Sequence, residues 1–361
     1  MTRVERLLQE LTEAHGPSGF EDPVRAIMRR ELAPLSTCME SDGMGSLIAP
    51  LKGAAGSPRI MLTAHMDEVG MLVKYVTPEG FIRFQPLGGW LDEALINQRY
   101  AIATRKGVVL GVTGIKTVHV MTAEERANPE FRWQHMFIDV GAASQRDAEE
   151  RLGIRPGDPI APHSPFMPLA GGELYLGKAW DDRAGLAVMI EVMRRLVEDP
   201  PPGALHAVAT VQEEVGLRGA LTSVNQVRPE VGINLEAGVA SDYPGITQEE
   251  AQEKMGQGPS LHLHDSSMLP NLRLRDLVID VAAEQGIPLQ FNVLTGYGHD
   301  GAAIQKAAAG APCINIAIPT RYLHSHNSVL SRKDFDRTVD LVTALVRRLD
   351  AETLSHLKSF D

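Results

Sequence analysis

The chain has 361 residues, which is enough for one large domain or two ordinary domains with a well-buried core. Its 35 Lys and Arg residues against 46 Asp and Glu residues give a formal net charge of −11, and no basic run is present, so nucleic acid and anionic membranes are not expected partners. Cys38 and Cys313 lack metal spacing, and no apolar stretch resembles a secretion signal or a membrane span, which predicts a cytoplasmic protein.

Two helices are predicted at the start of the chain. Thr2 and Glu5 have the spacing of a capping box, and the helix that they begin is expected to stop at Gly16. Asp22 is expected to cap a second helix, with Pro23 in its first turn.

Short strands are then predicted over residues 46–51 and 60–64. The second is an apolar run that ends abruptly in His65, Asp67 and Glu68. Polar residues just past the carboxyl end of a buried strand occupy the position in which open α/β sheets place their sites. The sequence therefore predicts a functional site at this strand end.

The pattern changes between residues 69 and 169. Short alternating stretches at 81–84, 100–104 and 108–112 are separated by glycine-rich turns. This spacing is typical of a small all-β unit, and we predict a barrel or sandwich inserted into the main fold.

After residue 170 strands and helices alternate. Helices are predicted at 182–197, around 274–281, from about Asp300, and after Ser331; strands are predicted at 205–211, 231–235, 289–294 and 313–318. Such alternation predicts an α/β fold with a mostly parallel central sheet flanked by helices. Residues 1–68 and 170–361 would form this catalytic domain, and residues 69–169 the inserted β-barrel.

Five potential metal ligands fall at or near the predicted strand ends: His65, Asp181, Glu214, Glu236 and His324. A carboxylate such as Asp181 can bridge two cations, which would leave His65 and Glu236 for one metal, and Glu214 and His324 for the other. Mixed histidine and carboxylate ligation suits zinc, with cobalt or manganese as substitutes.

Two further acidic residues have predicted roles beside the metals. Asp67 is placed to accept the second imidazole N–H of His65 and to fix its tautomer. Glu213 remains uncoordinated, and a free carboxylate beside a metal is a natural general base.

Each of these residues also has an ordinary structural interpretation. A single histidine at a strand end is more often a surface or hydrogen-bonded residue than a ligand. Asp182 can be a helix cap, the pair Glu213 and Glu214 a solvated turn, and Glu236 a strand terminus. Their joint occurrence in a coherent α/β order favours the metal site.

The chain resembles the tetrahedral aminopeptidases, a branch of the di-zinc exopeptidases, over nearly its whole length. The segments that carry the resemblance are PSGFE (17–21), AHMDEVG (64–70), GKAWDDRAG (177–185), VQEEVG (211–216) and PTRYLHS (319–325). The resemblance implies that Asp181 rather than Asp182 bridges the metals, that Glu213 is the base, and that His324 rather than His326 is the last ligand. It also implies that the β insertion mediates dimerisation, within a tetrahedral dodecamer.

Two positions depart from the family pattern. Glu236 stands where these enzymes commonly have Asp, and Glu there accompanies carboxypeptidases and deacylases in the wider group. His299 stands where relatives usually have Thr, and we interpret it as a neighbour of a helix cap. His262 and His264 alternate, and we expect them to be pocket or interface residues rather than a metal pair.

The sequence thus predicts a metal-dependent aminopeptidase that removes N-terminal residues from short peptides with two divalent cations. Carboxy-terminal cleavage or deacylation by the same metals is the alternative that Glu236 raises. Glycoside hydrolysis is a third, because some relatives carry an endoglucanase label and two carboxylates support that reaction; it would leave His65 and His324 unexplained. For assembly, the expected contact residues in the insertion are Trp90, Phe131, Trp133 and Phe137.

Overall fold

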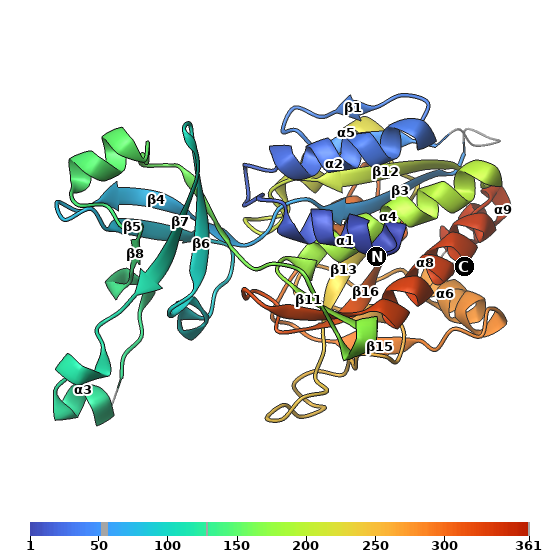
Figure 1. Ribbon diagram of the computed structural model, residues 1–361. Helices are drawn as coiled ribbons and strands as arrows, with labels where there is room; N and C mark the ends of the chain where they lie inside the picture. The colour runs from blue at the N-terminus through green and yellow to red at the C-terminus, as the bar shows by residue number, and fades with distance from the viewer. Residues whose placement is uncertain (52–56, 128, 360–361) are drawn as a thin grey trace.

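The computed structural model describes residues 1–51, 57–127 and 129–359 (Figure 1). Its larger part is an eleven-stranded sheet with helices on both faces, and its smaller part is a closed β-barrel that lies to one side (Figure 1). The expected α/β class with an inserted all-β unit is confirmed. None of the helices in the described residues is long and apolar enough to cross a membrane.

The centre of the large sheet consists of four parallel strands in the order β12, β3, β13 and β16. They span Ala204–Thr210, Arg59–His65, Val231–Val239 and Cys313–Arg321. The outer strands pair antiparallel, except for β14 and β15, which pair parallel with each other. These outer strands are β1 (Glu40–Ser41), β2 (Leu47–Pro50), β10 (Met167–Leu169), β11 (Leu174–Gly177), β14 (Ser260–His264), β15 (Gln290–Val293) and β17 (Ser328–Ser331).

The sequence of the central strand β3 is a continuous apolar run, and its packing explains why. Ile60 and Leu62 face one core, while Met61 faces a second core on the opposite side of the sheet. Strands that are covered on both faces need apolar residues at successive positions. Helices pack on both faces of β3 and therefore hold this strand in the middle of the molecule.

Two layers of helices cover the sheet. The first layer packs on the larger core and comprises α1 (Arg3–Glu13), α2 (Asp22–Leu32), α4 (Trp180–Glu198), α6 (Leu272–Glu284), α8 (Arg332–Arg348) and α9 (Ala351–Leu357). The second layer comprises α5 (Arg218–Val227) and α7 (Gly301–Gln305). The short terminal helix α9 was not predicted separately from the sequence.

Helix starts agree with the sequence in two cases and differ in a third. The capping box of Thr2 and Glu5 is present in α1, and Ser331 caps α8 by accepting the backbone N–H of Asp334. Asp22, however, is the first residue of α2 rather than its cap, and the cap position belongs to Glu21. The buried Glu21 carboxylate instead accepts the backbone N–H groups of Gly19 and Gln212, which ties this turn to the loop after β12.

The barrel is built from six strands in the order β4, β5, β8, β7, β6 and β9. They span Gly70–Val76, Ile82–Leu87, Phe137–Asp139, Gly107–Gly114, Arg99–Thr104 and Pro159–Pro162, and the short helix α3 is Ala123–Ala127. Alternate residues such as Ile82, Phe84 and Ile102 fill its own apolar core. Strand β10 lies inside the predicted 69–169 insertion but pairs with β11 of the large sheet.

Candidate metal centre

The central strands bring together side chains that are far apart in the sequence. His65 is the last residue of β3, Glu213 and Glu214 follow β12, and Glu236 lies within β13. Asp181 is in the first turn of α4, and His324 follows β16. Because parallel strands end at the same edge of the sheet, these residues meet where open α/β sheets bind their ligands.

Asp181 lies between the two histidines. Its Oδ1 is 3.0 Å from His65 Nε2, and its Oδ2 is 3.3 Å from His324 Nε2. On the first side Glu236 Oε1 is 3.5 Å from His65 Nε2, and on the second side Glu214 Oε2 is 3.5 Å from His324 Nε2. The five side chains therefore form two half-sites, each with one histidine and one glutamate, which share one aspartate.

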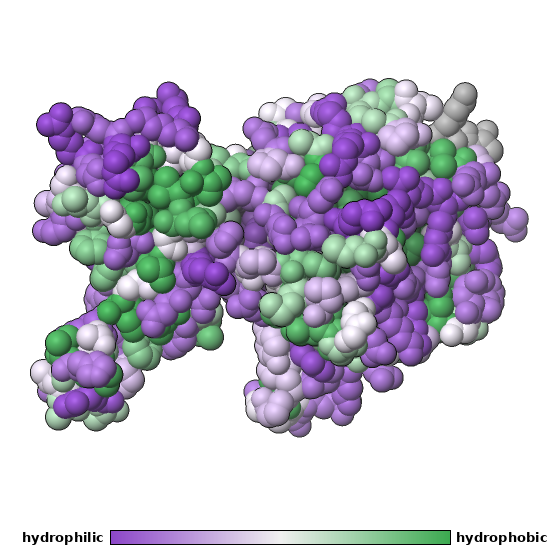
Figure 2. Space-filling view, in the orientation of Figure 1, coloured by the Kyte–Doolittle hydropathy of each residue, from purple (hydrophilic) through white to green (hydrophobic). Residues whose placement is uncertain are grey.

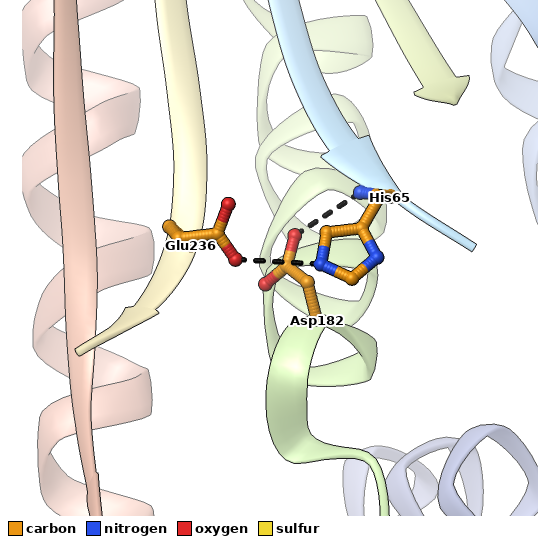
Figure 3. A group of neighbouring side chains, drawn as sticks. All are labelled: His65, Asp182 and Glu236. Carbon is orange, nitrogen blue, oxygen red and sulfur yellow. Dashed lines mark hydrogen bonds and ion pairs between the residues drawn. The ribbon is translucent and has the colours of Figure 1, made fainter. Parts of the chain in front are cut away.

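The adjacent Asp182 is fully buried and is arranged differently. Its Oδ2 accepts the backbone N–H of His65 at 3.2 Å, and its Oδ1 accepts the backbone N–H of Gly185 at 3.0 Å. Figure 3 shows its side chain extending from the start of α4 toward His65 at the end of β3, with Glu236 pointing toward the imidazole of His65 from the neighbouring strand β13. A bond to an N–H three residues further on is typical of a residue that caps a helix.

Both aspartates nevertheless belong to groups that are compact enough for a metal ion. The potential ligand atoms of His65, Asp182 and Glu236 lie within 4.8 Å of one another, and so do those of His65, Asp181 and Glu214. The two oxygens of Asp182 already accept backbone hydrogen bonds, whereas those of Asp181 face histidine nitrogens.

The residues fit a pair of divalent cations. Among the residues that the structure describes, Glu214 Oε1 and Glu236 Oε2 are buried without a hydrogen-bond partner. Burial raises the pKa of Glu213, Glu214 and Glu236, and neighbouring carboxylates add to that effect: Glu236 and Glu214 for Glu213, and Asp181 for the other two. So many carboxylates in one buried cluster are costly unless cations neutralise them.

The pKa values of the two histidines are also raised, although burial acts on a histidine in the opposite direction. Burial by itself would lower the pKa of His65, but the nearby Glu236 carboxylate and the hydrogen bonds to Asp181 and Asp67 raise it. Likewise, burial lowers the pKa of His324, while Glu214 and Asp181 raise it to about 10. Without metal the site therefore holds protons where cations would otherwise bind.

Asp67 connects the two sides of the cluster. His65 Nδ1 lies 3.0 Å from its backbone oxygen and 3.4 Å from its carboxylate. The same carboxylate accepts the backbone N–H groups of Glu213 at 2.9 Å and Glu214 at 3.2 Å, and the hydroxyl of Ser18 at 2.6 Å. The contact with Glu213 and Glu214 was not predicted, because a backbone donor leaves no signal in the sequence.

The remaining histidines of interest do not join the cluster. His262 is buried and its Nε2 lies 2.8 Å from Glu253, whereas His264 Nδ1 faces the backbone oxygen of Leu294. An irregularity in β14 between the two residues breaks the alternation that would have put both on one face. His299 is buried against the wall of the pocket beside the cluster.

Two acidic residues behind the site were not assigned a role from the sequence. Asp300 is buried, accepts the hydroxyl of Thr210 at 2.5 Å, and helps to raise the pKa of Glu213. Asp265 is buried and lies 2.9 Å from His299 Nδ1. A helix from about Asp300 and a cap neighbour at His299 were predicted, but neither contact follows from residue spacing.

A pocket of about 520 Å³ opens onto the cluster. Its wall includes Asp181, Glu213, Glu214, Glu236 and His324. A cavity of this size, with convergent ionisable groups of shifted pKa, is the usual form of an enzyme active site.

Comparison with protein families agrees with this geometry. The family model of the M42 glutamyl aminopeptidases matches residues 45–341, and a second model, AMPT, matches residues 2–28. The glutamyl aminopeptidase of Lactococcus lactis is 31% identical over 357 residues, which cover 98% of each chain. The lysyl aminopeptidase of Pyrococcus furiosus is 32% identical over 348 residues, which cover 95% of this chain and 96% of that protein.

Solved structures of related proteins share the whole fold. A TET aminopeptidase from a marine sediment archaeon of the Thaumarchaeota is 42% identical, with a TM-score of 0.96 and 99% of each chain covered. The TET1 peptidase of Pyrococcus horikoshii, described as assembling into a tetrahedron or a large octahedral shell, is 31% identical, with a TM-score of 0.86 and coverage of 96% and 100%.

A protein from Thermotoga maritima that is named an endoglucanase is 26% identical, with a TM-score of 0.77 and coverage of 98% and 99%. The family model spans most of the chain, and both aminopeptidase relatives exceed 30% identity over nearly all of it. The chain belongs to the M42 glutamyl aminopeptidase family, a family of metal-dependent aminopeptidases.

Proposed function

We propose that this enzyme removes N-terminal residues from short peptides at a centre of two divalent cations, with zinc as the native metal and cobalt or manganese as substitutes. His65 and Glu236 would hold one cation, Glu214 and His324 the other, and Asp181 would bridge them. The observation that carries the proposal is the position of Asp181, which presents one oxygen to each histidine. Histidine and carboxylate ligands suit zinc.

When bound, the cations would polarise the scissile carbonyl and lower the pKa of water. Glu213 would accept a proton from that water and return it to the leaving amine. Its Oε2 lies 4.0 Å from His65 Nε2, farther than the closest oxygens of Asp181 and Glu236, so it adjoins the cluster without belonging to either half-site. Burial raises the pKa of Glu213, which favours both acceptance and return of the proton.

Asp67 would act on the site through its neighbours. Its backbone oxygen and carboxylate face His65 Nδ1, which holds the imidazole with Nε2 toward the cluster. The hydrogen bonds that its carboxylate accepts from the N–H groups of Glu213 and Glu214 fix the positions of the proposed base and of a proposed ligand relative to His65.

The free amino group of the substrate needs an acceptor inside the pocket. Glu236, which lines the pocket, or a nearby acceptor would hold this ammonium group. A glutamate at this position also keeps the second candidate open, which is carboxy-terminal cleavage or deacylation at the same centre. Glycoside hydrolysis needs two carboxylates and would leave His65 and His324, which lie beside Asp181, without a role. We therefore disfavour it, although one relative is named an endoglucanase.

Assembly is part of the proposal. We propose that the barrel joins two copies into a dimer and that dimers form a tetrahedral dodecamer. The description of the Pyrococcus horikoshii relative as assembling into a tetrahedron or a large octahedral shell supports a closed particle. An enclosed particle would admit short peptides and exclude folded proteins.

Chelation followed by addition of single metals tests the proposed chemistry. We expect exhaustive chelation to abolish hydrolysis of leucine p-nitroanilide, and zinc, cobalt or manganese to restore it. Faster hydrolysis of N-acetyl-leucine derivatives or of blocked peptides than of free-amine substrates would support the second candidate instead. Unchanged activity after chelation would contradict the proposal.

A further inference from the structure

The pocket beside the cluster has a closed end and an open end. The Glu236 and His299 side chains are 4% and 6% exposed, whereas that of His324 is 36% exposed. An aminopeptidase substrate is one residue long on one side of the scissile bond and longer on the other. The longer part must run toward solvent, so the first residue lies at the end formed by Glu236 and His299.

The pocket offers that residue an uncharged surface. Ala237 and Val239 come from β13, Leu217 precedes α5, and Leu323 and Tyr297 complete the wall. Among the described residues that line the pocket, none is Lys or Arg, and all four carboxylates belong to the proposed metal and proton machinery. A charged substrate side chain would therefore lose its hydration without gaining an oppositely charged partner of its own.

His299, the remaining side chain of the closed end, is held as a neutral ring. The Asp265 carboxylate accepts the backbone N–H groups of Ser267 and Met268 and the amide of Asn315. This number of donors keeps Asp265 ionised, so His299 Nδ1 is assigned as the donor toward it at 2.9 Å. Burial lowers the pKa of His299 as well.

The His299 ring is also fixed in place. It packs against Tyr297, with ring centroids 4.8 Å apart, and against His262, with centroids 4.9 Å apart. Apart from the Glu236 carboxylate, which is assigned to the metal centre, the closed end therefore presents His299 and its packed aromatic neighbours, which carry no charge.

We infer that this end is the specificity pocket and that it selects uncharged, mainly apolar first residues such as leucine over glutamate and lysine. The inference rests on the proposed aminopeptidase function and adds the substrate class to it. A single methylene group in an apolar pocket already changes kcat/KM by about 10–200-fold, so we expect a preference for leucine of at least about tenfold.

The test compares leucine, glutamate and lysine p-nitroanilides with the zinc-loaded enzyme. Leu217→Lys should raise the ratio of glutamate to lysine hydrolysis, and Leu217→Glu should lower it. Leu221→Lys and Leu221→Glu are matched controls, because Leu221 is 55% exposed on α5 and does not line the pocket. Val239→Lys provides the same readout if the Leu217 variants fold poorly.

A wild-type preference for glutamate or lysine would overturn the inference, and so would Leu217 and Val239 variants that change the ratio no more than the Leu221 controls. Calorimetry with the free amino acids gives a readout without turnover, in which leucine should bind more tightly than the other two. If leucine binds best but no free-amine substrate is cleaved, the proposed function fails and the specificity pocket stands. Equal binding of all three would contradict the pocket itself.

Discussion

His65 Nδ1 lies 3.0 Å from the backbone oxygen of Asp67 and 3.4 Å from its carboxylate. With Nδ1 facing only acceptors, the neutral imidazole carries its proton there and leaves Nε2 free toward Asp181 and Glu236. Asp67 therefore orients a proposed metal ligand.

The first prediction concerns Asp67→Asn. The amide replaces one of the two carboxylate oxygens with an NH₂ group, so either the N–H of Glu213 or that of Glu214 loses its acceptor, and the segment that carries both residues should shift. Loss of such a supporting contact lowers metal affinity by about 10–100-fold. Competition with a fluorescent chelator measures the change, and Asp280→Asn, exposed on α6, is the control. Equal affinity in the two variants would mean that Asp67 is not a positioning residue.

The second prediction concerns Glu213→Gln, which keeps the shape of the side chain but removes its ability to accept a proton. We expect both metals to be retained and kcat to fall by about 10²–10⁴-fold. Elemental analysis and steady-state kinetics check the two parts, with Glu352→Gln, exposed on α9, as the control. A variant that keeps the metals and the full rate would remove Glu213 from the mechanism.

The third prediction concerns proton release when metal binds. The carboxylates Glu214 and Asp181 outweigh burial and raise the pKa of His324 to about 10, so this histidine is protonated in the metal-free site at pH 7. A cation can bind only the neutral imidazole, and binding must therefore displace that proton. Apparent affinity should rise as the pH is raised from 6 to 9, because fewer protons then compete.

Calorimetric titration of zinc in buffers with different ionisation enthalpies counts the released protons. The variant His324→Gln should release fewer, while His119→Gln, on an exposed residue of the barrel unit, should match the wild type. Affinity that is independent of pH over this range would contradict the predicted competition.

The sequence predicted those features that local patterns encode. Apolar runs and the polar residues that follow them located β3 and β12, and thus His65, Glu213 and Glu214. Glu236 was expected at a strand terminus, but β13 continues to Val239 because it keeps its pairing with β16 as far as Thr320. A strand that is buried on both faces has no polar alternation to mark where it ends.

Local sequence patterns did not predict contacts between segments that are far apart in the chain. The bond from Thr210 to Asp300 joins residues 90 positions apart, and neither residue type indicates the other. In the barrel, the expected contact residues Trp90, Phe131 and Trp133 are partly buried against the barrel core. Aromatic residues serve cores and interfaces equally well, so composition does not distinguish the two uses.

The structure identifies a different apolar surface on the barrel. Val108, Leu110 and Val112 alternate along β7 and are 63%, 55% and 40% exposed. Alternate residues of a strand share one face, so these three side chains form a stripe on the outside of the barrel. In Figure 2 apolar surface is visible over this part of the molecule, at the left of the view.

The last prediction follows from this stripe. If the barrel joins two copies, the outer face of β7 should lie in the contact, because an exposed apolar stripe gains most from burial in a specific interface. Leu110→Asp would put a charge at its centre, and loss of a central anchor weakens an interface by about 2 kcal/mol or more. Leu221→Asp, with the same 55% exposure but on α5, controls for the general effect of a surface charge.

Light scattering over a dilution series should give a multiple of 39.3 kDa for the wild type and the control, and a smaller particle for Leu110→Asp. Circular dichroism, measured beside light scattering, separates assembly from folding. A variant that dissociates but keeps the wild-type spectrum has lost only the contact between copies. A wild-type mass of 39.3 kDa at every concentration would exclude the proposed assembly, because a closed particle requires more than one copy. An intact particle in Leu110→Asp would instead move the contact away from β7 and leave the stripe without a role in assembly.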